Sequence, residues 1–372
     1  MPIRRMEERF GLPSGKFAVT YTVKNEARLL PSAIEYHFAA GCSRIYVFWD
    51  GTTDNSKELV SKYACVTARD SIRVEEAADA PEWIQKILYW WEPDMDVRKR
   101  INTYYAAKAA AAEGLEWLIS IDPDELVLMS RDEEIAEDHI SKHLVRIPED
   151  VDQILMPNLE SLPTSATTTD NFADCVYFFN RFPKTEAIER YSRALLLRIS
   201  RSPALVAWYD YVFYQVRFFR ALPRLMREPR SGRRIPAGYF LGYSNHKSII
   251  RLKTFASFDF ATHHWRAFQR APRNMRLGNI LHFDMLDANY FAAKFRQRQQ
   301  GILLKVFYLR YRLALVARDS SDDEIREFFE RYIVISDPER IAHLKRRGIV
   351  SEIHAAANFM RRHRTVAPCP KS

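Results

Sequence analysis

The stretch Glu116-Trp117-Leu118-Ile119-Ser120-Ile121-Asp122-Pro123-Asp124-Glu125-Leu126 joins an apolar run to three carboxylates. The run from Trp117 to Ile121 is short and almost continuous, as expected of a strand that is buried on both faces. Pro123 cannot extend the hydrogen-bond ladder of a sheet, so we expect the strand to end at Asp122. The rigid proline should let Asp122 and Asp124 point the same way.

Two converging carboxylates repel each other unless a cation joins them. Hard oxygen ligands select Mg²⁺ or Mn²⁺, and these ions usually take one or two carboxylates together with substrate phosphates. The Asp122-x-Asp124 pair therefore predicts a site for a divalent cation and a nucleotide diphosphate. The alternative interpretation is a solvated acidic turn that closes a strand.

The composition of the chain limits its class and its partners. A length of 372 residues predicts about two structural units. The 56 Lys and Arg against 47 Asp and Glu give a net charge of +9, which favours anionic partners such as sugar nucleotides or an anionic membrane surface. No zinc-ligand spacing, helix-turn-helix pattern or RNA-recognition signature accompanies the charge, so we expect no nucleic-acid partner.

The cysteines and the N-terminal residues bear on the compartment. The four cysteines, Cys42, Cys65, Cys175 and Cys369, have no paired spacing, which argues against a disulfide framework and a zinc cluster. Residues 1–15 are charged and lack the apolar centre of a signal peptide, and no segment approaches the ~20 apolar residues of a spanning helix. We expect a cytoplasmic protein. Peripheral binding at the inner face of the membrane is the alternative location.

The first half of the chain alternates predicted strands and helices. Strands over 17–23 and 44–49 flank a helix over 31–40 that Gly41 ends, and a further helix is predicted over 97–113. Such βαβ units impose a parallel sheet, and ligands of these sheets bind at the carboxyl ends of the strands. Asp50 and Asp122 should both lie there.

The chain contains an ordered set of short motifs, which are Lys24-Asn25-Glu26-Ala27, Glu35-Tyr36-His37, Asp50-Gly51-Thr52-Thr53-Asp54, Arg100-x-Asn102 and Asp122-x-Asp124-Glu125. This set resembles bacterial glycosyltransferases of family 2 and family 92. The resemblance covers about the first third of the chain closely. It implies a GT-A fold, which is an α/β fold with a Rossmann-like, mixed and mainly parallel sheet flanked by helices. It also implies a UDP-type or GDP-type sugar donor and Mn²⁺ or Mg²⁺.

The resemblance assigns roles to individual residues. The nucleotide-binding residues it implies are Asn25, Glu26, Asp50, Arg100, Asn102, Lys247 and Arg251, and Asp122 and Asp124 would hold the metal. Trp49 stands where the family usually has an acid, which leaves base recognition open, and Leu126 replaces a common Phe.

A third metal ligand is expected from a distant histidine. The candidates are His263, His264 and His282, of which the resemblance favours the adjacent pair and keeps His282 as a second choice. For each of them the alternative is a hydrogen-bonded imidazole with a structural role.

The segment Gly242–Arg251 resembles the loop that closes over the donor in this family. Lys247 and Arg251 would then neutralise the leaving diphosphate. The alternative is a basic edge strand whose lysine prevents pairing. Arg98 is interpreted as a residue of a solvated helix face.

The catalytic base is not singled out by any spacing. An inverting transfer needs a base for the acceptor hydroxyl, and the candidates are Glu125, Glu160 and Asp174. Residues 156–174 are rich in Asn, Ser, Thr and Pro, which predicts a long loop of the kind that contacts substrates.

The second half changes in composition. Residues 203–234 combine aromatic and arginine residues, a pattern that fits a core helix, an interfacial membrane helix or a site for a polyanionic acceptor. Helices are predicted over 289–300, 322–332 and 338–347. The predicted organisation is a GT-A domain over 15–270, a helical C-terminal extension over 271–360 and a disordered tail over 361–372.

The sequence thus predicts a metal-dependent glycosyltransferase that uses a nucleotide-diphosphate sugar and a glycan acceptor in surface polysaccharide synthesis. One alternative is a non-enzymatic protein that binds polyanions or membranes and keeps a degenerate GT-A core. A nucleotidyltransferase is the other, although Lys24-Asn25-Glu26 stands where such enzymes carry a Gly-rich loop.

Overall fold

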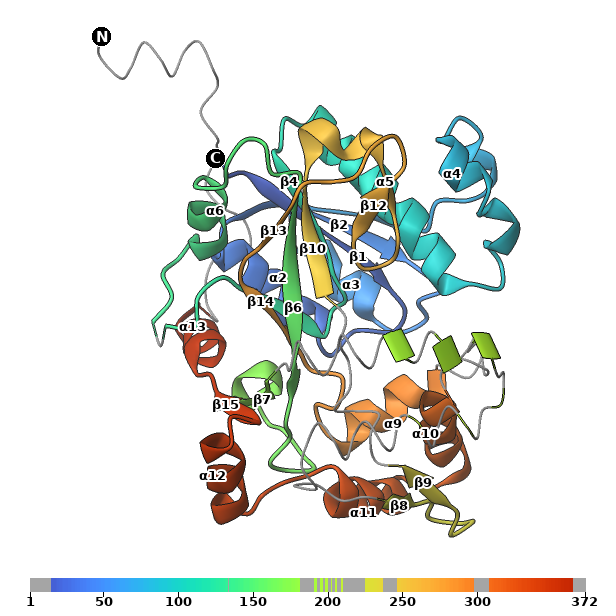
Figure 1. Cartoon of the computed structure of the whole chain (residues 1–372), viewed down its shortest axis with the longest axis vertical. Coiled ribbons are helices and arrows are strands. Elements are labelled where there is room, and N and C mark those ends of the chain that lie inside the picture. Colours follow the sequence, from blue (N-terminus) through green and yellow to red (C-terminus); the bar gives the residue numbers. More distant parts are fainter. Residues whose placement is uncertain are drawn as a thin grey trace. The chain divides into compact units, whose positions relative to one another are not determined.

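The computed structural model describes residues 15–180 except 133, residues 225–236, 246–297 and 308–363, and scattered residues between 191 and 209. The chain divides into two compact units (Figure 1). Unit 1 comprises Met1–Pro157, Asn245–Ile280 and Asn358–Ser372, and unit 2 comprises Asn158–Ser244 and Leu281–Ala357. This division differs from the predicted boundary at 270, because the segment from Asn158 groups with the C-terminal helices.

Unit 1 is built on a mixed, mainly parallel sheet. The strand order is β6 (Gln153–Ser161), β10 (His246–Arg251), β4 (Trp117–Ser120), β1 (Phe17–Val23), β2 (Cys42–Trp49) and β3 (Val66–Asp70). Strands β4, β1, β2 and β3 are parallel neighbours, whereas β10 is antiparallel to both β4 and β6. A further strand, β13 (Asn274–Arg276), pairs in parallel with β6. The predicted α/β class with a mainly parallel sheet is confirmed.

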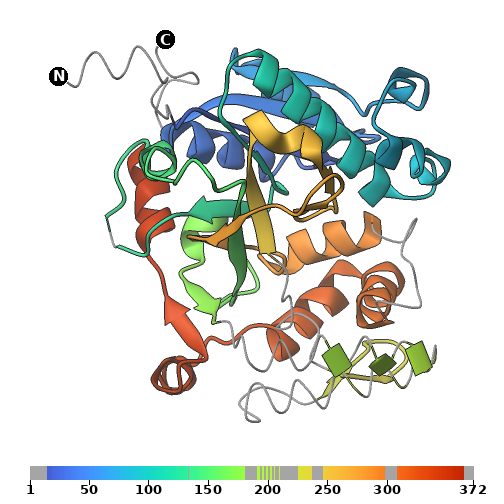
Figure 2. The ribbon, with the colours of Figure 1, turned by 45° about the horizontal axis from the view of Figure 1, so that its top comes forward.

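Helices cover both faces of this sheet, as Figures 1 and 2 show. On β1, Tyr21 reaches His37 of α2 (Leu30–Ala39), while the next residue, Thr22, accepts a hydrogen bond from Asn102 of α5 (Met95–Ala112). Since consecutive strand side chains point to opposite faces, α2 and α5 lie on opposite faces of the sheet. Burial on both faces explains why the central strand β4 is a nearly continuous apolar run.

The two helices begin and end close to the predicted residues. Gly41 follows α2 with a φ of 99°, a left-handed conformation that glycine adopts without strain. A Cβ at this position would also meet the Ser141 Oγ at 2.6 Å. At the start of α5, the Asp94 carboxylate accepts a hydrogen bond from the Asp96 amide at 2.8 Å and caps the helix.

Shorter elements complete unit 1. They are α3 (Ser56–Ser61), η1 (Glu75–Ala77), α4 (Glu82–Gln85), η2 (Leu88–Trp90), β5 (Glu125–Leu128), α6 (His139–Leu144), η5 (Leu252–Ser257), β11 (Phe258–Phe260) and β12 (Trp265–Ala267). Side chains of α5, β2, β4 and β11 form one hydrophobic core, which includes Ile101, Phe48, Leu118 and Phe260.

Unit 2 combines short strands with C-terminal helices. The end of β6 pairs with β7 (Tyr177–Phe179), which pairs with β15 (Val350–Glu352). The helices are α9 (Ala288–Gln297), α10 (Tyr308–Asp319), α11 (Asp322–Tyr332), α12 (Pro338–Arg346) and the first residues of α13 (Ala355–His363). The remaining elements of the second half are η3 (Asn171–Asp174), the hairpin β8 (Leu225–Arg227) and β9 (Arg234–Pro236), and β14 (Asn279–His282).

The helical C-terminal region predicted from the sequence is confirmed. A capping box between Ser321 and Glu324 begins α11 at the predicted residue, and Phe291, Phe295 and Phe329 pack in the core of this unit. Residues 361–363, predicted to be disordered, belong to α13. The other tail residues, 364–372, lie outside the described part, as does most of the aromatic and basic region 203–234.

Two local predictions are wrong. Residues 156–161, predicted as loop, belong to β6, because this segment pairs with β10 and β7. The segment 246–251, predicted as a closing loop or an edge strand, is the interior strand β10, which is hydrogen-bonded on both sides.

Each unit contains a buried cysteine. Cys42 and Cys175 are free and buried, whereas Cys65 is disulfide-bonded, which the sequence pattern did not indicate. Within the described residues, no helix has the length and apolar character needed to cross a membrane.

Candidate functional site

Three neighbouring parallel strands of unit 1 end in polar residues. Strand β1 lies between β2 and β4, and Val23 pairs with Trp49 at the end of the β1–β2 ladder. Asn25 follows β1, Asp50 follows β2 and Asp122 follows β4. The carboxyl ends of parallel strands share one edge of the sheet, where ligands of such folds bind. The structure therefore brings together the strand ends that the sequence singled out.

Asp122 is held between two lysines from distant elements. Lys99 of α5 donates to its Oδ1, and Lys247 of β10 donates to its Oδ2 at 2.7 Å. Lys247 also pairs with Glu125 at 2.9 Å and is fully buried, whereas the Asp122 side chain is 35% exposed. Both oxygens of this carboxylate thus have an ammonium partner.

These contacts shift the titration of all three groups. Burial alone would raise the pKa of Asp122, but the charges of Lys247 and Lys99 outweigh it and hold that pKa far below its usual range. Burial disfavours the charged form of Lys247, yet Asp122 and Glu125 raise its pKa above the ordinary value. The pKa of Lys99 is lowered by burial, which Asp122 only partly offsets.

The turn after β4 is fixed by Glu125. Its carboxylate accepts a hydrogen bond from the Asp122 amide at 2.9 Å, and its own amide donates to the Asp122 carbonyl at 3.0 Å. Glu125 is 1% exposed and Asp124 is 3% exposed. Glu125, one of the candidate bases, is therefore buried and stabilises the turn that carries Asp124.

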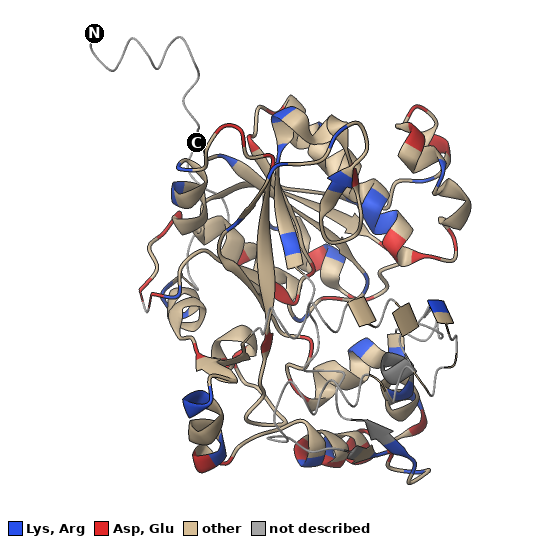
Figure 3. Cartoon of the chain, in the orientation of Figure 1, with Lys and Arg blue, Asp and Glu red and all other residues tan. Residues whose placement is uncertain are grey.

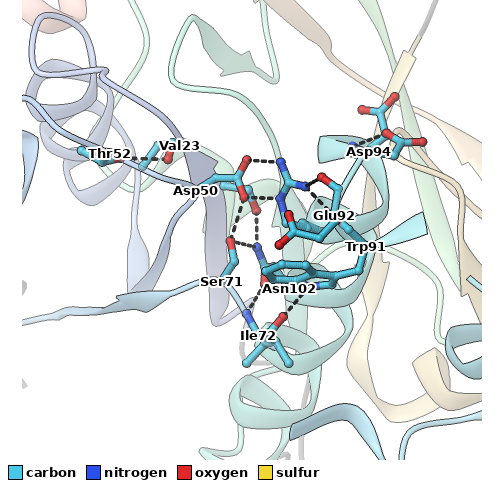
Figure 4. A network of polar contacts seen from close by, with 12 residues as sticks. Val23, Asp50, Thr52, Ser71, Ile72, Trp91, Glu92, Asp94 and Asn102 are labelled. Atoms are coloured by element: carbon cyan, nitrogen blue, oxygen red, sulfur yellow. Dashed lines mark hydrogen bonds and ion pairs between the residues drawn. The ribbon is translucent and has the colours of Figure 1, made fainter. Parts of the chain in front are cut away.

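Asp50 lies in a second polar network, shown in Figure 4. The Arg98 guanidinium binds its carboxylate through two nitrogens, at 2.5 and 2.9 Å, and Ser71 Oγ donates to it at 3.2 Å. The interpretation of Arg98 as a solvated helix residue is wrong, because its side chain is directed to this carboxylate. Such bidentate pairs are among the stronger hydrogen-bonded contacts in proteins.

Asn102 and Arg100 are directed into the fold. Asn102 is fully buried, donates to Thr22 and Ser71 at 3.1 Å each, and accepts from the Ile72 amide. Arg100 donates to the Phe260 carbonyl at 2.5 Å. Asn102 thereby belongs to the network around Asp50, whereas Arg100 binds the chain at β11.

Asn25 and Glu26 shape the loop that follows β1. Asn25 has a φ of 56°, and its side-chain oxygen accepts from the Thr53 amide at 2.7 Å and the Asp54 amide at 3.2 Å. The Glu26 amide donates to Ser56 Oγ at 3.1 Å. These bonds join the loops after β1 and β2, so two of the motifs noted in the sequence form one structural unit.

The predicted histidines separate into two groups. His263 is partly buried, and its pKa is lowered well below the ordinary value by desolvation and then by the charges of Lys247 and Lys99, so it lies in the field of the Asp122 cluster. The His264 ring packs on His246 at 4.9 Å between centroids. Both belong to unit 1, whereas His282 belongs to unit 2.

His282 is paired with Glu160, one of the candidate bases. Its Nδ1 lies 2.8 and 2.9 Å from the two Glu160 oxygens, and both residues are buried. A carboxylate on Nδ1 fixes that nitrogen as the protonated one and directs the lone pair of Nε2 the other way. The nearest ligand atoms of His282 and Asp284 lie within 4.8 Å, and Asp284 pairs with Lys294 at 2.6 Å.

Two predicted residues have partners away from these clusters. Arg251 pairs with Trp117 in the β10–β4 ladder, at the opposite end of β4 from Asp122, and its guanidinium binds Glu116 and stacks 4.0 Å from the Trp117 ring. Asp174 in unit 2 accepts hydrogen bonds from the Thr169 and Asp170 amides, at 2.7 and 2.8 Å. The structure does not bring Arg251 to the strand ends.

Sequence reasoning missed Lys99 and misjudged Arg98. A signal for Lys99 exists, because residues 99, 103, 106 and 110 recur at helical spacing and are all buried on α5. A lysine on a buried helix face needs a counter-charge, which would have pointed to a carboxylate at a neighbouring strand end. Arg98 has no comparable periodic signal.

Comparisons with known proteins give distant similarities. No family model matches the chain. It is 23% identical over 340 residues to an Arabidopsis thaliana protein described as glycosyltransferase-like, covering 87% of this chain and 58% of that protein. A second glycosyltransferase-like protein of Arabidopsis thaliana is 23% identical over 343 residues, with 87% and 66% covered. The chain therefore spans 58 to 66% of the length of these curated relatives.

Similar solved structures include glucosyl-3-phosphoglycerate synthase from Mycobacterium tuberculosis. The complex of that enzyme with Mn²⁺, UDP-glucose and phosphoglyceric acid has a TM-score of 0.30 and 15% identity, with 76% of each chain covered. Its complex with Mg²⁺ and UDP has a TM-score of 0.29 and 13% identity, with 81% of this chain and 83% of that chain covered. Similarity at this level assigns no activity to the chain.

Proposed function

We propose that the chain is a metal-dependent glycosyltransferase that transfers a sugar from a nucleotide-diphosphate donor of the UDP or GDP type to a glycan acceptor. The observation that carries the proposal is the convergence of Asn25, Asp50 and the Asp122–Asp124 turn at the carboxyl ends of three adjacent parallel strands. Sequence similarity to proteins described as glycosyltransferase-like supports it. Surface polysaccharide synthesis and inversion at the transferred carbon belong to the same proposal.

The charges around Asp122 bear on which carboxylate of this turn suits a divalent cation. Both oxygens of Asp122 bind ammonium groups, and two ammonium groups so near would repel a divalent cation. Asp124 supplies the other carboxylate of the same turn, and a carboxylate suits Mg²⁺ or Mn²⁺. We therefore assign Asp124 as the metal ligand at this turn and Asp122 as the residue whose carboxylate pairs with Lys99 and Lys247.

His282 has the geometry of a metal-binding histidine. A carboxylate on Nδ1 favours the tautomer with the proton on Nδ1, so the lone pair of the neutral ring is on Nε2, the atom through which this histidine would bind a cation. Among the three histidines predicted from the sequence, His282 is therefore our choice, and Glu160 acts on it as a positioning residue. When bound, the cation would supply positive charge to the departing diphosphate.

The roles of the remaining candidates follow from their contacts. Lys247 has its charge committed to two carboxylates, so it supports the turn, and Arg98 orients Asp50 for the nucleotide. Arg251 supports the opposite end of β4. Glu125, Glu160 and Asp174 each hold local structure, and the acceptor base is left unassigned.

The proposal is tested by calorimetric titration of UDP and GDP in the presence and absence of Mn²⁺. We expect metal-dependent binding to the wild type and at least 10-fold weaker binding in Asp124→Asn and in His282→Gln. Asp323→Asn, an exposed carboxylate in the first turn of α11, is the matched control and should bind as the wild type does. Absence of metal-dependent binding to the wild type would favour the non-enzymatic alternative. A donor panel that measures hydrolysis of nucleotide sugars then identifies the sugar.

A further inference from the structure

An exposed aromatic pair stands between α4 and α5 in unit 1. Tyr89 is 83% exposed and Trp90 is 55% exposed, and their rings pack edge to face with centroids 5.2 Å apart. Met95, the next exposed large hydrophobic residue along the chain, is 50% exposed. Two large rings held together on the surface expose apolar faces that a ligand can cover.

The segment that carries the pair is anchored. Trp91, the third aromatic residue of the run, donates from Nε1 to the Ile72 carbonyl at 2.8 Å. The Trp90 and Asp94 amides donate to the carbonyls of Ile87 and Trp90, at 2.9 and 3.1 Å. The backbone that carries Tyr89 and Trp90 is therefore held in place, so the two rings are preorganised for binding a ligand.

The charges around the pair select the chemistry of the ligand. Residues 82–96 contain four acidic residues, Glu82, Glu92, Asp94 and Asp96, and one basic residue, Lys86, which pairs with Glu82 at 2.6 Å. In Figure 3 the ribbon is red at acidic residues of α4 and of the start of α5, and basic residues of α5 follow in blue. Arg98 also contacts this segment, but its charge is paired with Asp50. The net negative charge of residues 82–96 therefore disfavours an anionic membrane or a polyphosphate. Exposed aromatic faces in an acidic segment of the chain suit a neutral polyol, which offers C–H groups to the rings and hydroxyl donors to the acids.

One side chain connects this segment with the donor side of the sheet. Arg98 donates through Nη1 to the carbonyls of Trp91 and Glu92, at 2.6 and 2.9 Å, while its other nitrogens bind Asp50. Figure 4 shows Asp50, Trp91 and Glu92 within this network. The aromatic segment is thus fixed to the residue that follows β2.

We propose that Tyr89 and Trp90 form a binding platform for the saccharide acceptor, a neutral glycan whose sugar rings stack on the two aromatic faces. This inference rests on the proposed glycosyltransferase function and adds the class and the place of the acceptor. In this proposal, the carboxylates of residues 82–96 accept hydrogen bonds from the sugar hydroxyls.

The experiment measures binding of neutral hexasaccharides of glucose, mannose and galactose to the full chain by calorimetry. We expect binding of at least one hexasaccharide by the wild type, at least 10-fold weaker binding in Tyr89→Ala and Trp90→Ala, and retention within about 3-fold in Trp90→Phe, which keeps an aromatic face. Phe268→Ala, an aromatic residue that is 37% exposed elsewhere in unit 1, is the control and should bind normally. Thermal unfolding of each variant establishes that it is folded.

Three outcomes overturn the inference. The first is a wild type that binds none of the hexasaccharides, and the second is a Tyr89→Ala/Trp90→Ala double variant that binds them as well as the wild type does. The third is loss of binding to phosphatidylcholine vesicles in the double variant with no change in hexasaccharide binding, which would make the platform a membrane contact. Mn²⁺-dependent UDP binding, measured on the same samples, should be unchanged in the platform variants. Its loss in the wild type would instead contradict the proposed function.

Discussion

Replacement of Lys247 by methionine tests the structure most directly. Lys247 is fully buried and pairs with Asp122 at 2.7 Å and with Glu125 at 2.9 Å. Methionine keeps the apolar stem of the side chain and removes only the charge. The Asp122 side chain is 35% exposed, so water screens its charge when the lysine is removed. The Glu125 side chain is 1% exposed, so its charge would remain buried and unscreened.

Removing one partner of a buried ion pair typically costs about 3–5 kcal/mol, because the remaining charge stays buried without compensation. Since most of the effect falls on Glu125, we expect the free energy of unfolding of Lys247→Met to fall by about 3 kcal/mol. Urea unfolding followed by circular dichroism and tryptophan fluorescence measures it. Lys253→Met removes an exposed lysine of η5 and should change the same quantity by less than about 0.5 kcal/mol.

A double-mutant cycle separates the charge effect from a packing effect. Combining Lys247→Met with Glu125→Gln removes the carboxylate that the first change leaves unpaired, so the two losses should be non-additive by about 1–3 kcal/mol. The reasoning is refuted if Lys247→Met costs less than about 1 kcal/mol, or if the two changes are additive.

Three further predictions concern other parts of the chain. His37 is fully buried, and burial lowers its pKa from 6.5 to about 4. The neutral imidazole therefore stabilises the fold above pH 6.5, and about 3 kcal/mol of stability is lost as the pH falls towards 4. In urea unfolding between pH 7 and 4, the free energy of unfolding of His37→Gln should fall less steeply with pH than that of the wild type, and an equal dependence on pH contradicts this prediction. Glu160→Gln should weaken Mn²⁺ binding about 10–100-fold in calorimetry without unfolding the chain, whereas equal affinity would remove the case for His282 as a ligand. Arg98→Lys keeps the charge but not the bidentate contact with Asp50, so UDP affinity should fall by at least 5-fold while Arg100→Lys leaves it within about 2-fold; equal effects would separate Asp50 from nucleotide binding.

Much of the fold was legible in the sequence because it depends on local patterns. The strand that ends at Asp122 and the helices α2, α5 and α11 follow from apolar runs, helical spacing, Gly41 and the Ser321 cap. The errors at 156–161 and 246–251 have one origin. A segment becomes an interior strand only when it has one partner strand on each side, and the composition of the segment does not show whether those partners exist.

The sequence by itself determined which residues stand at the strand ends, because periodicity and proline fix where each strand stops. Only the tertiary structure decided what those residues contact. Asp122 meets Lys99 and Lys247, which are 23 and 125 positions away, Asp50 meets Arg98 at 48 positions, and Glu160 meets His282 at 122. The physical reason is that a buried charge takes whichever counter-charge the packing delivers, and packing depends on strand order, which residue spacing does not encode.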